Sequence, residues 1–171
     1  MSSPELMSLD EFRKRTSLSA RQVIYACEKL LIKPAEDRGG RGHHRGFSEE
    51  NVVEYRLGQL LINNGLELRQ VASVLALVRS FFEQARKRAS DGPSTMPRSL
   101  AEASDEKPAW LYVLDFAAVM LSFRDATGNT HYTDFVRVLA GGGFSGSFHG
   151  DQQTIDGATT VLRIDLAKLP R

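Results

Sequence analysis

The sequence predicts an α+β protein, with a helical N-terminal domain followed by a small β-β-α-β domain. Before Ser90 the apolar residues recur at helical spacing, whereas after Trp110 they fall into short β-prone runs separated by glycine. Residues 90–108 are rich in proline, glycine, serine and acidic residues and show no sustained apolar period, which is typical of a linker. We therefore expect one domain at residues 1–89 and another at residues 109–171.

Composition excludes several classes of protein. The chain has 171 residues, 22 Lys and Arg against 21 Asp and Glu, and a single cysteine, Cys27. One cysteine rules out an internal disulfide and a multi-thiolate metal cage. No apolar run approaches the roughly 18 residues of a membrane span, and residues 1–10 lack the features of a secretory signal. We expect a cytoplasmic protein without a cofactor, a metal site or a membrane partner.

The basic residues are concentrated near the N-terminus. Residues 1–90 hold 15 Lys and Arg against 11 Asp and Glu, whereas residues 91–171 hold 7 against 10. Nine basic and only three acidic residues lie between Arg13 and Arg45, a local charge of +6. Such a patch can attract a polyanion, although a solvated basic surface is the alternative.

Two capping patterns predict the first two helices. Ser8 precedes Glu11 by three residues, and Ser19 precedes Gln22 by the same distance, so each pair can satisfy backbone N–H groups of a first helical turn. The first helix is expected to end near Thr16. Two helices separated by about three residues indicate a helix-turn-helix.

The second helix is predicted to have one apolar face and one polar face. The expected core stripe consists of Ala20, Val23, Ile24, Cys27, Leu30 and Leu31. The opposite face then presents Arg21, Gln22, Tyr25, Glu28 and Lys29. Arginine and glutamine match the edges of guanine and adenine in a major groove, and tyrosine donates to phosphate.

Pro34 ends the helical pattern, and residues 35–46 are predicted to form a glycine- and arginine-rich hairpin, called here the basic hairpin. We expect Phe47 to anchor its returning strand. Glycine lets a backbone approach a phosphate closely and arginine supplies charge and forked donors, as a DNA-contacting wing requires. The alternative is a disordered basic loop.

Two further helices are expected. Ser48 caps the third, which ends at Gly65, and the fourth begins near Glu67 and runs for roughly 20 residues. Its apolar spacing predicts a contact with a second copy of the chain, against the alternative of packing on its own C-terminal domain. The expected dimer contacts are Val74, Val78, Phe81, Phe82 and Ala85.

The order of these features resembles the MerR-type winged helix-turn-helix over residues 6–75. In that family the wing usually ends in Tyr-Arg-x-Tyr-Ser-x-Glu-Asp, where this chain has His44-Arg45-Gly46-Phe47-Ser48-Glu49-Glu50, and the next helix pair opens with Gly-(Phe or Leu)-x-Leu, here residues 65–68. The chain departs from the family at residues 24–26, where Ile-Tyr-Ala replaces Arg-Tyr-Tyr, at His44, and in lacking the cysteines of metal-sensing members.

The resemblance implies that Arg21 and Gln22 approach bases, and that Tyr25 and Arg45 approach phosphates. Together with the basic patch, it gives the full set of expected DNA-binding residues: Arg13, Lys14, Ser19, Arg21, Gln22, Tyr25, Arg38, Arg41, His43, His44 and Arg45.

In the C-terminal part we expect strands at residues 110–116 and 118–123, a short helix at 133–139, and a third strand at 159–166. Gly141, Gly143 and Gly146 satisfy G-x-G-x-x-G, but without a strand before them and a helix after them they indicate a flexible turn. This domain could bind a small-molecule or protein effector or hold a dimer together. A core of about 60 residues is thin, so it should lean on the helical domain or on a partner chain.

The leading hypothesis is a homodimeric, sequence-specific regulator of transcription that binds double-stranded DNA. No carboxylate pair or nucleophile arrangement suggests an enzyme. Two alternatives stay open: an architectural or excision-type DNA-binding protein, and an effector- or protein-interaction module for which DNA is secondary.

Overall fold

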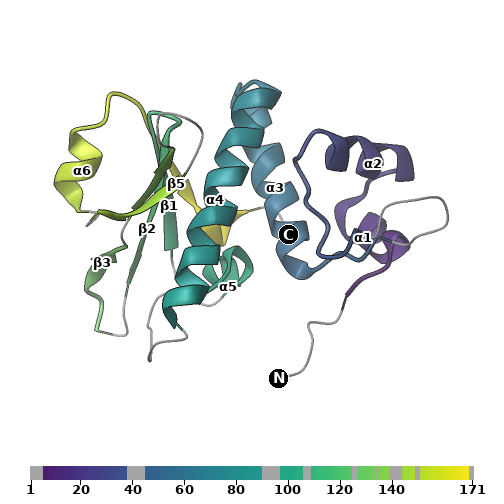
Figure 1. Cartoon of the computed structure of the whole chain (residues 1–171), viewed down its shortest axis with the longest axis horizontal. Coiled ribbons are helices and arrows are strands. Elements are labelled where there is room, and N and C mark those ends of the chain that lie inside the picture. Colours follow the sequence, from purple (N-terminus) through teal and green to yellow (C-terminus); the bar gives the residue numbers. More distant parts are fainter. Residues whose placement is uncertain are drawn as a thin grey trace. The chain divides into compact units, whose positions relative to one another are not determined.

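The chain has a mixed α+β fold, as predicted, and falls into two compact units, residues 1–72 and 73–171 (Figure 1). The computed structural model describes residues 6–37, 45–89, 97–105, 109–124, 127–133, 135–138, 144–148 and 151–169.

The first two helices form where the capping patterns predict them. Helix α1 spans Leu9–Thr16 and helix α2 spans Ala20–Glu28, and both capping boxes, Ser8 with Glu11 and Ser19 with Gln22, are formed. Ser17 takes a left-handed conformation with φ of 57° and ends α1. The chain therefore reverses within three residues, with both helix ends satisfied locally.

The base of the basic hairpin is held by two isolated β-bridges. Gly46 pairs with Glu36, and Phe47 pairs with Met7, both antiparallel. Phe47 is fully buried and stacks on Phe12, with ring centroids 4.4 Å apart. A Cβ atom at Gly46 would approach the Leu6 Cδ1 atom to 3.0 Å, so the strands meet where only glycine fits without a shift. Phe47 thus anchors the returning strand as predicted.

Helices α3 (Glu49–Asn63) and α4 (Leu68–Ala89) follow. Asn51 accepts a hydrogen bond from the Ser48 backbone N–H at 3.1 Å, which fixes the start of α3. Gly65 has φ of +89° and its N–H donates to the Ile62 carbonyl at 2.9 Å, so it ends the helix as predicted. Helix α4 has 22 residues, close to the expected length.

The second unit is built on an antiparallel sheet. Its strands are β1 (Ala109–Leu114), β2 (Ala118–Arg124), β3 (Thr130–Tyr132), β4 (Phe135–Val138), β5 (Phe144–Phe148) and β6 (Val161–Asp165). The order across the sheet is β5-β4-β2-β1-β6, and β3 pairs with β2 beside β4. Thr133 lies between β3 and β4, and its hydroxyl group bonds both the N–H and the carbonyl of Leu121.

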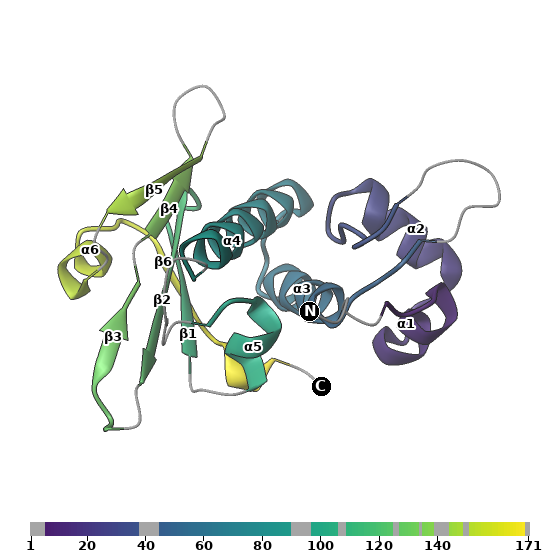
Figure 2. The same cartoon turned by 60° about the horizontal axis from the view of Figure 1, so that its bottom comes forward.

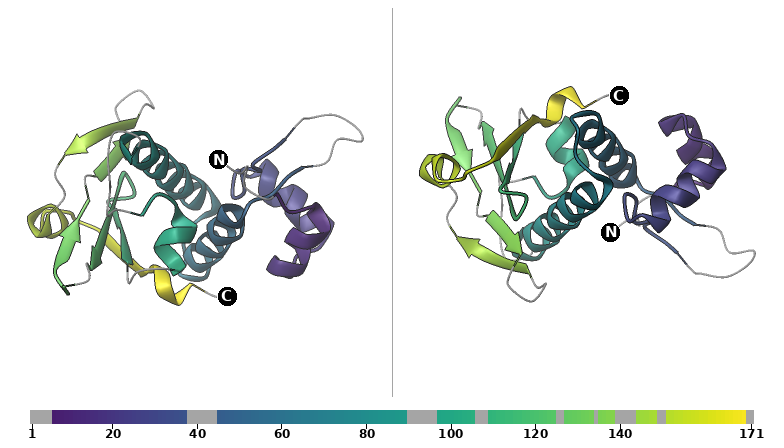
Figure 3. Two further views of the ribbon diagram at one scale, coloured as in Figure 1. Left: turned by 90° about the horizontal axis from the view of Figure 1, so that it is seen from below. Right: turned by 90° about the horizontal axis from the view of Figure 1, so that it is seen from above.

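Helices cover both faces of this sheet (Figures 2 and 3). Residues 73–89 of α4 and helix α5 (Leu100–Asp105) lie along one face, which carries the fully buried Leu111, Val113, Val119 and Leu121. Helix α6 (Gln152–Asp156) lies on the other, where its Ile155 packs with Tyr112, Leu114, Ala118 and Met120. A short 3-10 helix, η1 (Leu166–Lys168), follows β6 and contacts α5.

Three sequence predictions for the second half are wrong. Residues 133–139 were expected to be helical, but β4 occupies residues 135–138, because its backbone pairs with both β2 and β5. The expected linker contains α5, whose Leu100 and Ala103 are fully buried. The boundary between the units consequently falls inside α4, and residues 73–89 belong with the C-terminal sheet. The strands predicted at 110–116, 118–123 and 159–166 correspond to β1, β2 and β6.

The expected dimer contacts are also corrected. Val74, Val78, Phe81, Phe82 and Ala85 are each at most 7% exposed within a single chain. Because the chain's own residues already cover these side chains, they offer no free surface to a second copy. The apolar pattern correctly predicts a helix with a buried face, but that face is buried within the chain and not against a second copy.

Candidate nucleic-acid interface

Helix α2 turns one narrow face into the core and leaves the other in solvent. Val23, Ala26 and Cys27 are buried, whereas Arg21, Gln22, Tyr25 and Glu28 are exposed. At 100° per residue, Arg21, Tyr25 and Glu28 lie directly opposite the buried side. We call Arg21, Gln22, Tyr25 and Glu28 the outer face of α2.

Two residues of the predicted core stripe are exposed instead. Ile24 is 44% exposed and Leu30 is 63% exposed. Helix α2 ends at Glu28, so Leu30 lies beyond it with a left-handed φ of 60°, and the buried places are taken by Leu31 and Ile32. Ile24 flanks the outer face, at the edge of the stripe. The helix thus ends earlier than predicted by the apolar spacing, which continues to Leu31.

The capping box at the start of α2 limits what Gln22 can offer. The Gln22 side-chain carbonyl accepts from the Ser19 backbone N–H at 2.8 Å, and the Ser19 hydroxyl oxygen accepts from the Gln22 N–H at 3.3 Å. Ser19 therefore serves the helix end. Gln22 keeps only its amide N–H₂ group for an external partner while the box is closed.

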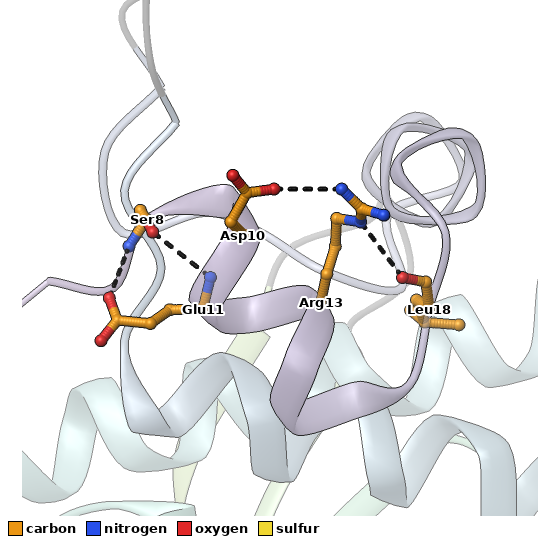
Figure 4. A network of polar contacts seen from close by, with 5 residues as sticks. All are labelled: Ser8, Asp10, Glu11, Arg13 and Leu18. Atoms are coloured by element: carbon orange, nitrogen blue, oxygen red, sulfur yellow. Dashed lines mark hydrogen bonds and ion pairs between the residues drawn. The ribbon is translucent and has the colours of Figure 1, made fainter.

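Arg13 also has a partner inside the chain (Figure 4). Its Nη1 atom lies 3.0 Å from an Asp10 carboxylate oxygen, and its Nε atom donates to the Leu18 carbonyl at 3.3 Å. The guanidinium thus links the first turn of α1 to the loop between α1 and α2. Arg13 was expected to bind DNA, but this geometry supports a bracing role for it.

Other expected contact residues differ in how free they are. Lys14 is exposed, and Arg15, beside it, forms an ion pair with Glu49. The Arg45 Nε atom lies 3.2 Å from an Asp37 carboxylate oxygen at the base of the basic hairpin, which leaves its terminal N–H₂ groups for other acceptors. Arg38, Arg41, His43 and His44, all expected at the hairpin tip, lie outside the described residues.

The Arg21 side chain is exposed and makes no hydrogen bond or ion pair to any described residue. Lys29 lies over the Tyr25 ring, with its Nζ atom 5.6 Å from the ring centroid, so it holds that side chain from one side. The structure thus brings Arg21, Gln22 and Tyr25 together on one helix.

The remaining chemistry-bearing residues do not form a catalytic arrangement in the described part of the chain. Cys27 is buried, and burial raises the pKa of its thiol above the ordinary value, an effect that the nearby Arg45 guanidinium only partly offsets. His131 stacks on Phe123 with centroids 5.6 Å apart. Among the residues that the structure describes, no three His, Cys, Asp or Glu side chains gather as metal ligands would.

Comparison with known proteins does not supply a family. No protein-family model matches the chain, and neither does any curated protein sequence. Of the helices in the described part of the chain, none has both the length and the hydropathy that a membrane span needs.

Proposed function

We propose that this protein is a sequence-specific, double-stranded-DNA-binding transcriptional regulator, with α1, α2 and the basic hairpin acting as a winged helix-turn-helix of the MerR type. Helix α2 enters the major groove in this proposal, and the basic hairpin lies on the flanking backbone. One observation carries it: Arg21, Gln22 and Tyr25 share an exposed face of α2, and the side chains of this face make few contacts within the fold.

Local structure supports the proposal. The turn between α1 and α2 is fixed by two capping boxes and by Arg13, so local side-chain to backbone hydrogen bonds set the direction in which α2 leaves the turn. A rigid element holds side chains for base reading at a lower entropic cost. The hairpin base is likewise fixed by Phe47, which is fully buried.

The free side chains suggest specific roles. Arg21 can donate both edges of its guanidinium to a guanine, and the free amide N–H₂ of Gln22 can donate to a base acceptor. Ile24 is exposed beside them and has no polar group with which to bind a base. The apolar feature of the major groove is the thymine methyl group, and in this proposal Ile24 contacts it.

The test begins with selection of bound fragments from genomic DNA by the full chain. Binding of the selected fragment is then measured across a range of salt concentrations. Arg21→Ala should cost about 1 to 3 kcal/mol and relax sequence preference, because a base contact is lost. Arg45→Ala should weaken all sequences alike and reduce the salt slope by about 1, because a phosphate contact is lost.

Lys87→Ala is the matched control, since Lys87 is an exposed cation of α4 that forms an ion pair with Glu83. The control should bind like the unaltered chain. If the chain selects no fragment at low salt, or if Arg21→Ala and Arg45→Ala bind as the control does, the proposal is wrong. Sedimentation of the selected complex tests the expected homodimer, whose contact surface has to lie outside the buried face of α4.

A further inference from the structure

The second unit carries a cluster of one tryptophan and two arginines on its sheet. Trp110 on β1 is directly opposite Ser122 on β2 and Asp165 on β6. Arg124 follows Ser122 by two residues and Arg163 precedes Asp165 by two, so all three side chains emerge on the same face, with the two arginines on either side of β1 and displaced in opposite directions along it. This is the face on which α6 lies, and Trp110 packs at the margin of the α6 cluster, half-buried.

Both guanidinium groups lie close to the indole ring. The Arg163 Cζ atom is 5.1 Å and the Arg124 Cζ atom 5.9 Å from the ring centroid. Contact with the ring restricts each arginine but uses only its π surface, so the N–H donors at the edge of the guanidinium plane stay available. Forked donors of this kind bind carboxylate and phosphate oxygens in pairs.

The charge of these arginines is not balanced on the sheet. Asp165 is the one carboxylate on this face among the described residues of β1, β2, β3 and β6. One Asp165 oxygen accepts from the Ala167 N–H at 3.2 Å and the other lies 3.3 Å from the Lys168 Nζ atom. Neither Arg124 nor Arg163 makes an ion pair with any residue in the described ranges. Each arginine is therefore available to an anionic group of a ligand.

We propose that Trp110, Arg124 and Arg163 form a binding site for an oxyanion, presented by a carboxylate or a phosphate group of a small molecule. The indole holds both arginines near their binding positions, which lowers the entropic cost of engaging them. The site belongs to the second unit and does not depend on the proposed DNA-binding surface. It gives that unit the chemistry of a sensor for an anionic metabolite.

Trp110 is the only tryptophan in the chain, so its fluorescence reports this site alone. The full chain is titrated with inorganic phosphate and, separately, with succinate, at constant ionic strength set with sodium chloride. We expect a saturable change of emission with at least one anion, at a Kd on the order of 0.1 to 1 mM. A response to phosphate alone identifies a phosphate ligand, and a response to succinate alone identifies a carboxylate.

Variants then assign the response to the two arginines. Arg124→Gln and Arg163→Gln should each raise the Kd by about tenfold or more, because each removes charge-assisted hydrogen bonds. Arg86→Gln, which removes an exposed arginine of α4 in the same unit, should leave the Kd unchanged. Calorimetry provides a second readout that does not depend on tryptophan emission.

The inference is overturned if neither anion gives a saturable response up to about 10 mM, well above the expected Kd. It is also overturned if sodium chloride gives the same response, or if the three arginine variants behave alike. Circular dichroism verifies that each variant is folded. Should either glutamine variant unfold, Arg124→Lys and Arg163→Lys keep the charge while removing the fork, and they should still weaken binding.

Discussion

Arg13 provides a test that separates a structural role from a DNA contact. Arg13→Ala removes the ion pair with Asp10 and the hydrogen bond to the Leu18 carbonyl, while its side chain is 39% exposed. An exposed ion pair is worth at most about 1 kcal/mol and a net hydrogen bond about 0.5 to 1.5 kcal/mol. We expect the unit of residues 1–72 to lose about 1 to 2 kcal/mol, a factor of about 5 to 30 in its opening equilibrium.

The assay uses Cys27, which is the only cysteine and is buried on α2. A thiol reagent labels it only when α2 opens, so under fast reclosing the labelling rate follows the opening equilibrium. Arg13→Ala should raise that rate by the same factor of about 5 to 30, and Asp10→Ala by less, because the bond to Leu18 survives.

Lys14→Ala is the control, because Lys14 is the next residue of α1 and is exposed. It should leave the labelling rate unchanged. The reasoning is refuted if Lys14→Ala raises the rate as much as Arg13→Ala does. It is also refuted if Arg13→Ala leaves the rate unchanged but lowers the salt slope of DNA binding, because Arg13 would then act on a phosphate.

Three other substitutions test the fold. Phe47→Ala should lower the free energy of unfolding by about 3 to 5 kcal/mol in denaturant titration, because Phe47 is fully buried against Phe12, and Phe47→Leu should cost clearly less. Gly65→Ala should cost about 1 to 2 kcal/mol, because φ is +89°, and Gly65→Asn should cost less; equal effects would contradict the strain. Since burial raises the pKa of the Cys27 thiol, the folded state favours the neutral thiol. The resulting contribution to the free energy of unfolding is fully present below pH 9.0, the ordinary pKa of a thiol, and should be lost as the pH rises through the folded-state pKa. Cys27→Ala, compared with the unaltered chain at each pH, should lack that loss.

Local signals predicted the first unit well. A capping box depends only on two residues three positions apart, and the helix end at Gly65 depends only on the left-handed backbone that glycine adopts easily. The local sequence is therefore enough to predict these helix ends. The start of α5 carries the same kind of signal, because the Ser99 hydroxyl accepts from the Glu102 N–H at 3.0 Å. That spacing lies inside a segment whose composition is typical of a linker.

Other errors have tertiary causes. Phe135, Val136, Arg137 and Val138 are compatible with a short helix or a strand, and pairing with β2 and β5 decides in favour of the strand. The apolar spacing of α4 predicted that one face of the helix is buried, but periodicity does not say whether the chain itself or a second copy buries it. The exposed faces of α2 were predicted correctly for Arg21, Gln22 and Tyr25, whereas the role of Arg13 depends on a contact with the Leu18 carbonyl that no spacing rule reveals.

The outer face of α2 also bears on how such a protein could diversify. Arg21, Tyr25 and Glu28 point away from the buried Val23, Ala26 and Cys27, and the reversal that orients the helix is secured by Ser8, Glu11, Ser19 and Arg13. Under the proposed function, exchanging the three outward residues should alter what the helix recognises while sparing the scaffold. Gene duplicates could drift to new targets by a few point changes, without first acquiring extra stability.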